Sequence, residues 1–142
     1  MTLVEFLRAM YAAEEQHARD LDGEEWRADT QVGDEYNIAV VVDRRGSPVA
    51  RCGAEGLDGG ELRARHIARH DPARVLRDVE AKRRILDSYV AEFGEDELNG
   101  DVGYSPEQWL ARQTLRLLAL PYADHPDYNP QWGVFVKEKT GG

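Results

Sequence analysis

Two histidines stand one helical turn apart in the block of residues 66–84. At this i and i+4 spacing, one face of a helix presents the imidazoles of His66 and His70 to a single ion. Asp71 follows them directly and supplies a carboxylate. Pro72 comes next, at a position where a new helix can begin without losing a hydrogen bond. The chemistry that this block could support is metal binding by nitrogen and carboxylate ligands.

Further histidine and carboxylate side chains along the chain could complete such a metal site. Mixed ligands of these two kinds suit zinc, manganese or iron. If the segments converge, the site predicts a metal-dependent hydrolase with Asp71 or Glu14 as the base. The Glu14-x-x-His17 spacing also occurs in di-iron bundles, but those need a second such pair, which this chain lacks. The candidate metal ligands are His66, His70, His125, Asp71, Glu14 and His17.

The same residues also fit a structural network that needs no ligand, and we favour this interpretation, with no cofactor. Asp71 is expected to cap the helix that begins at Pro72, so that Asp71→Asn would be nearly neutral. His70 lies near a helix C-terminus, where a positive charge is favourable. A guanidinium of this block is expected to reach a carboxylate of another segment. The predicted network consists of Asp71, Arg69, Arg74 and His70.

The charges of the 142 residues are unevenly distributed around a net charge of −9. Residues 61–84 carry eight basic and four acidic side chains, whereas residues 1–35 and 85–108 are strongly acidic. The overall sign makes nucleic acid an unlikely partner. It leaves open an acidic mimic of nucleic acid that blocks a DNA-binding protein. Cys52 is the only cysteine, which excludes an internal disulfide and a thiolate zinc cage.

The length and the apolar pattern of the chain limit the class of protein to which it can belong. A chain of this size is typical of one domain, so we expect a single domain over residues 1–142. No apolar run approaches the ~18 residues that a membrane span needs. The N-terminus also lacks the features of a signal peptide. We therefore expect a cytoplasmic protein without a membrane partner.

The periodicity of the sequence predicts an α+β fold with a small antiparallel sheet packed on about four helices. β-branched residues on both sides of a turn indicate a hairpin at about 36–53, with weaker strand signals near 26–28 and 133–137. Residues 94–104 are expected to form an exposed acidic loop. The last helix is apolar nearly all round, which predicts a central, buried position. The helices are expected at residues 3–21, 61–70, 72–93 and 106–120.

Two long blocks carry a resemblance to known proteins. Residues 66–84 and 115–128, together with the helix that contains Phe6 and a tryptophan at position 26, resemble a large family of small uncharacterised proteins of actinobacteria and their phages. The resemblance implies a shared fold over most of the chain but no catalytic residues, because the family has no assigned activity. Many relatives have cysteines where this chain has residues 99–109, so the resemblance implies no cysteine-based metal site here.

We therefore expect a non-enzymatic intracellular accessory protein, of phage or mobile-element type, that acts through a protein partner. A homo-oligomer is possible under the same interpretation. The metal-dependent hydrolase and the nucleic-acid mimic remain as alternatives.

Overall fold

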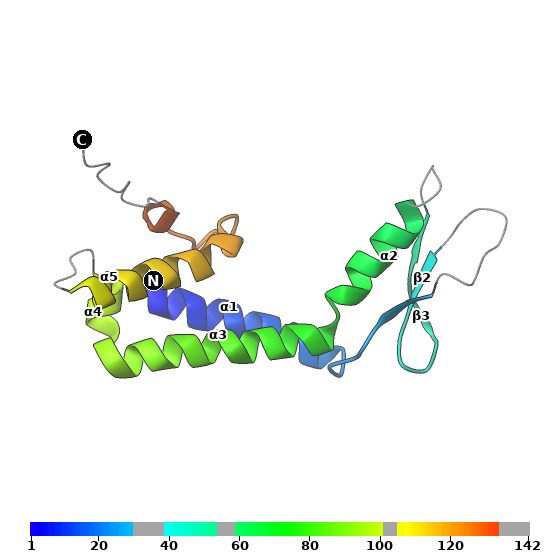
Figure 1. Ribbon diagram of the computed structural model, residues 1–142, viewed down its shortest axis with the longest axis horizontal. Coiled ribbons are helices and arrows are strands. Elements are labelled where there is room, and N and C mark those ends of the chain that lie inside the picture. Colours follow the sequence, from blue (N-terminus) through cyan, green and yellow to red (C-terminus); the bar gives the residue numbers. More distant parts are fainter. Residues whose placement is uncertain (30–38, 54–58, 101–104, 134–142) are drawn as a thin grey trace. The chain divides into compact units, whose positions relative to one another are not determined.

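The computed structural model describes residues 1–29, 39–53, 59–100 and 105–133 (Figure 1). It divides into two compact units. We call Glu14–Val79 the sheet unit, and Met1–Ala13 with Glu80–Gly142 the helical unit. The strand expected near 133–137 lies outside the described residues, apart from Gly133. None of the described helices has a stretch long and apolar enough to cross a membrane.

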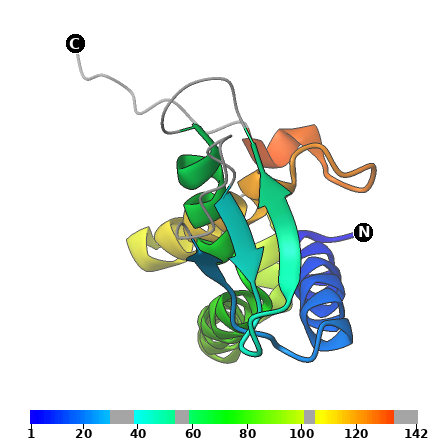
Figure 2. The ribbon, with the colours of Figure 1, turned by 90° about the vertical axis from the view of Figure 1, so that its right-hand side faces the viewer.

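The sheet unit contains a three-stranded antiparallel sheet in the order β1-β2-β3 (Figure 2). Its strands are β1 (Arg27–Asp29), β2 (Ala39–Val42) and β3 (Pro48–Cys52). The helix α2 (Gly59–Arg69) contacts all three strands. These elements confirm the predicted hairpin, the weaker strand near 26–28 and the α+β class.

One face of the sheet packs against α2 through small apolar side chains. Val41 is fully buried at the centre of β2, where it pairs with Ala28 on one side and Ala50 on the other. β-branched residues suit this position because they fill a pleated, buried surface. The buried cluster consists of Ala39, Val41, Cys52 and Ala64, and the side chains packed around it are Trp26, Ala28, Ala50, Ile67 and Ala68.

Three longer helices and the short helix α4 carry the rest of the fold. The first, α1 (Leu3–Asp20), begins with a capping box: the Glu5 N–H donates to the Thr2 hydroxyl at 3.2 Å, and the Thr2 N–H donates to the Glu5 carboxylate at 2.9 Å. The others are α3 (Pro72–Phe93) and α5 (Pro106–Ala119). All three lie within one residue of the predicted boundaries, since their caps and prolines are local signals.

The core of the helical unit is built around Phe6 of α1. Its ring is fully buried, and the ring of Trp132, which is also buried, lies 5.0 Å away between centroids. Three other rings from the segment after α5 contact Phe6 with centroids at 5.7–6.2 Å, in the tilted or edge-on arrangements that aromatic pairs favour. They belong to Tyr122, His125 and Tyr128.

The prediction of an exposed loop at 94–104 is wrong for its first half. Helix α4 (Glu95–Asn99) occupies this position, and its Leu98 is fully buried. The Asn99 side chain accepts a hydrogen bond from the Val4 N–H at 3.1 Å, which ties α4 to α1 within the helical unit. A helix of five residues is too short to show periodicity, so the sequence pattern could not indicate it.

The prediction that the last helix is buried all round is also wrong. Ala111, Leu115 and Ala119 are buried, and they recur every four residues along one face of α5. Leu110 and Leu117, in contrast, are 59% and 54% exposed. Only one stripe of α5 packs against other described residues, because small side chains spaced by four let neighbouring elements approach that face alone.

Candidate functional site

The junction between α2 and α3 is organised by the Asp71 carboxylate. One carboxylate oxygen accepts a hydrogen bond from the Arg74 N–H at 2.8 Å, which is the bond of a helix N-cap. The other oxygen accepts from the Trp26 N–H at 3.1 Å, across 45 residues of sequence. The side chain is buried, so both hydrogen bonds are largely shielded from water. Asp71 thus joins the start of α3 to the segment that enters β1.

Trp26 is held in place from two further directions. Its indole N–H donates to the Glu24 carboxylate at 3.0 Å, and the Glu24 carbonyl accepts from the Ala73 N–H at 3.0 Å. Just before them, Gly23 has a φ of 60°, a conformation that favours glycine, and a Cβ there would lie 3.0 Å from the Leu76 side chain. Sequence reasoning did not assign a role to Glu24 or Trp26, because their partners lie far away along the chain.

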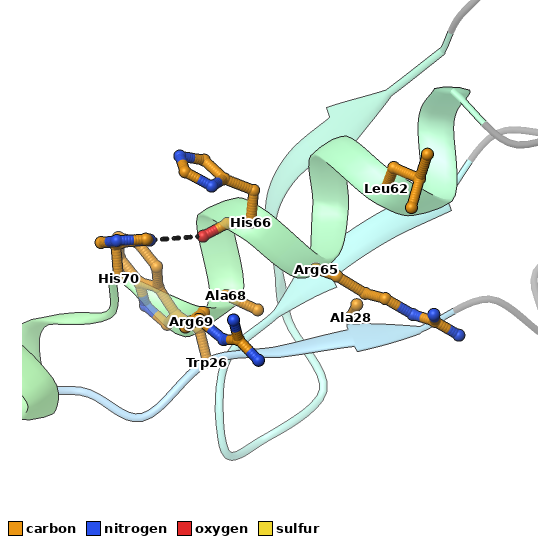
Figure 3. Close-up of a pocket in the computed structure, with 8 residues that line it drawn as sticks. All are labelled: Trp26, Ala28, Leu62, Arg65, His66, Ala68, Arg69 and His70. Carbon is orange, nitrogen blue, oxygen red and sulfur yellow. Dashed lines mark hydrogen bonds between the residues drawn. The ribbon is translucent and has the colours of Figure 1, made fainter.

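The two histidines of α2 are connected directly. The His70 Nδ1 lies 2.8 Å from the His66 carbonyl, shown by the dashed line in Figure 3. Since a carbonyl can only accept, this nitrogen carries the proton and the Nε2 faces outward without it in the neutral ring. The ring centroids are 4.5 Å apart, and both side chains are exposed.

The arginines of the predicted network lie at the junction but do not reach a carboxylate there. The Arg74 guanidinium donates to the Arg69 carbonyl at 3.4 Å. The Arg69 guanidinium makes no ion pair with any residue that the structure describes. Among the described residues, neither guanidinium forks onto a carboxylate of another segment, contrary to what the sequence led us to expect of one of them. Both side chains are exposed, so water solvates them at little cost.

Of the remaining candidate metal ligands, Glu14 and His17 line one hollow together with His70, whereas His125 does not. His125 belongs to the helical unit, where its Nδ1 accepts from the Asp127 N–H at 3.1 Å. Glu14 is half-buried and His17 is exposed on α1. In the described part of the chain, no three histidine, cysteine, aspartate or glutamate side chains lie close enough together to hold a metal ion.

An open groove of about 750 Å³ runs along α2 beside β1. Figure 3 shows the side chains of Arg65 and Arg69 extending from one side of the helix toward β1, with Ala28 beneath them. The eight residues that line the groove include no carboxylate. They are Trp26, Ala28, Leu62, Arg65, His66, Ala68, Arg69 and His70. We call this hollow the arginine groove.

The electrostatics of the arginine groove are positive within a chain that is negative overall. Arg65 pairs with Glu61 one turn earlier on α2, an exposed ion pair of the kind that contributes about 0–1 kcal/mol. Asp29 follows Ala28 on β1, and alternate residues of a strand point to opposite faces, so Asp29 faces away from the groove. An anionic ligand would therefore meet the Arg69 guanidinium directly and would compete with Glu61 for the Arg65 guanidinium, above an apolar floor.

Comparison with known proteins adds a family but no activity. A family model, described as a family of unknown function, matches residues 1–134. No curated protein and no solved structure matches the chain.

Proposed function

Because the chain belongs to DUF6221, a family of unknown function, we propose its role from the chemistry of its own surface. It is a non-enzymatic accessory protein that binds an acidic segment of a protein partner in the arginine groove. The observation that carries this proposal is the pair Arg65 and Arg69, which lie one turn apart on α2 and both line a groove whose lining residues include no carboxylate (Figure 3).

The spacing of the two arginines defines the ligand. Residues i and i+4 of a helix are about 6 Å apart along its axis, at 1.5 Å per residue. In an extended peptide, which advances about 3.3 Å per residue, carboxylates two positions apart span the same distance. Guanidinium groups bind carboxylates through two parallel hydrogen bonds, which favours arginine over lysine in such a site. The groove suits a segment with a Glu-x-Glu pattern.

A protein partner is favoured over nucleic acid by the size of the basic surface. Nucleic-acid binders that neutralise about six to ten phosphates obtain most of their affinity from those contacts. The arginine groove offers only two guanidinium groups, well below that number. A short acidic peptide needs no more than the two.

The test uses a fluorescein-labelled peptide of eight residues with glutamate at alternate positions, titrated with the full chain. We expect binding that weakens with salt and falls about tenfold or more in the double variant Arg65→Ala, Arg69→Ala. The matched control is Arg44→Ala, Arg45→Ala at the hairpin turn, which removes the same charge from exposed side chains and should change the affinity less than twofold.

Two results would overturn the proposal. Equal losses in both double variants would show that the peptide responds to net charge and not to the groove. Tighter binding of single-stranded DNA of the same length, lost on removal of Arg65 and Arg69, would identify the ligand as nucleic acid.

A further inference from the structure

A second hollow, of about 250 Å³, lies in the sheet unit next to the arginine groove. It is formed by the end of α1, the turn that follows it and the start of α3, and most of its lining is apolar. Ala18 and Pro72 are buried in it, while Leu21 is 47% exposed at its edge. The lining residues are Glu14, His17, Ala18, Leu21, Trp26, His70, Pro72 and Val75. We call it the apolar hollow.

Trp26 and His70 line both the arginine groove and the apolar hollow. We infer that the two hollows form one bipartite binding surface, which recognises an acidic segment adjoined by a large apolar side chain. This inference rests on the proposed function and specifies the partner further. Carboxylates bind Arg65 and Arg69, and the apolar side chain passes the Trp26–His70 wall and enters the apolar hollow.

The wall between the two hollows is fixed before any ligand arrives. The Trp26 backbone is bonded to Asp71 and its indole to Glu24, while the His70 ring is bonded to the His66 carbonyl. The Trp26 side chain also packs against the core of the sheet unit, and the His70 ring lies beside the His66 ring, with their centroids 4.5 Å apart. A surface whose side chains are already ordered loses less conformational entropy when it binds. The shared wall therefore favours one ligand that spans both hollows.

The chemistry of the two hollows differs in a way that sets the order of residues in the ligand. The arginine groove attracts carboxylates, whereas five of the eight residues that line the apolar hollow are apolar. Leu21 and Val75 instead offer apolar surface that becomes buried when a leucine or phenylalanine side chain enters. The ligand thus needs acidic residues on one side of the wall and a neutral apolar residue on the other.

The experiment compares labelled peptides with the full chain. The first is the alternating glutamate peptide. Two others carry one additional leucine, at the N-terminus or at the C-terminus, and their controls carry a serine instead of that leucine. We expect the leucine at one end to strengthen binding about tenfold, and the serine to have no effect. The gain should disappear in Leu21→Asp. It should persist in Leu117→Asp, an equally exposed leucine of the helical unit.

The outcomes separate the two proposals. If the glutamate peptide binds through Arg65 and Arg69 but neither leucine improves it, the bipartite surface is refuted and the proposed function stands. If neither peptide binds, both are refuted. A gain that survives Leu21→Asp would place the apolar contact elsewhere and would also refute this inference.

Discussion

Replacing Asp71 should reveal how much of the sheet unit depends on a single carboxylate. Asp71→Ala removes both acceptors at once, the one for the Arg74 N–H and the one for the Trp26 N–H. Loss of an N-cap costs about 0.5–2 kcal/mol. Loss of a hydrogen bond to a charged group costs about 1.5–3 kcal/mol. We therefore expect the free energy of unfolding to fall by about 2–5 kcal/mol.

Asp71→Asn should lose about half of this stability, roughly 1–2 kcal/mol. An asparagine side chain has one oxygen that accepts and one amide group that only donates, so it serves one of the two N–H groups and opposes the other. The expectation from the sequence that this substitution is nearly neutral considered the cap alone, and the Trp26 bond leads us to predict a loss instead. Asp71→Ser keeps a good cap for Arg74 and should also lose the Trp26 bond.

Urea unfolding followed by circular dichroism measures the total loss. Hydrogen exchange at the Trp26 amide shows whether its bond is lost, since two compact units need not unfold together. Asp87, an exposed aspartate of α3, provides the control, and its Ala and Asn variants should lie within about 0.5 kcal/mol of the parent. An Asp71→Asn variant as stable as the parent would refute the two-acceptor reasoning. Equal losses of stability in Asp71→Asn and Asp71→Ala would show that the negative charge of Asp71, and not its number of acceptors, provides the stability.

Leu115→Ala should lower the free energy of unfolding by about 2–5 kcal/mol because Leu115 is fully buried, whereas Leu117→Ala should lower it by less than about 0.5 kcal/mol. Urea unfolding measures both values, and similar losses would contradict the assignment of the buried stripe of α5. Arg112→Met should lower the free energy of unfolding by about 1–2 kcal/mol, because the buried guanidinium donates to the Glu97 carbonyl. An unchanged midpoint of urea unfolding would show that this hydrogen bond contributes nothing to stability. The hydrogen bond from the Thr2 N–H lowers the pKa of Glu5, so the stability it contributes is present above the ordinary glutamate pKa and is lost as the pH falls through the lowered value. The melting temperature, measured at decreasing pH, should show this loss in the parent but not in Glu5→Gln. If the melting temperatures of the two proteins fell in parallel, Glu5 would not contribute this stability. Zinc or manganese in stoichiometric amount, or a chelator, should leave the melting temperature unchanged, and a rise with metal that vanishes without the two α2 histidines would restore the hydrolase hypothesis.

The elements that the sequence predicted well are those with local signals. Pro72 fixed the start of α3 to the residue, and Ser105 marked the start of α5, where its hydroxyl accepts from the Gln108 N–H at 3.1 Å. The run of β-branched residues in β2 likewise needed no knowledge of its partners. These signals act over a few residues, so a single chain reveals them.

The features that the sequence did not predict depend on contacts between distant residues. The apolar residues of α5 are spread around most of the helix, so the pattern could not show that its buried stripe contains Leu115 and not Leu117. Helix α4 forms where Leu98 can be buried and Asn99 can bind the Val4 N–H, 95 residues away. For the site, the spacing of the α2 histidines was visible, but the anchoring of Trp26 by Asp71 was not.

The position of Cys52 gives the protein a built-in chemical reporter. It is the only cysteine of the chain, and it lies buried between β3 and α2 in the core of the sheet unit. A thiol reagent therefore has one target, which it reaches only when the strands separate from the helix. The rate of Cys52 labelling at increasing urea concentration would report the opening of the sheet unit alone. Circular dichroism follows the whole chain, so a comparison of the two would show whether the helical unit unfolds at a higher urea concentration.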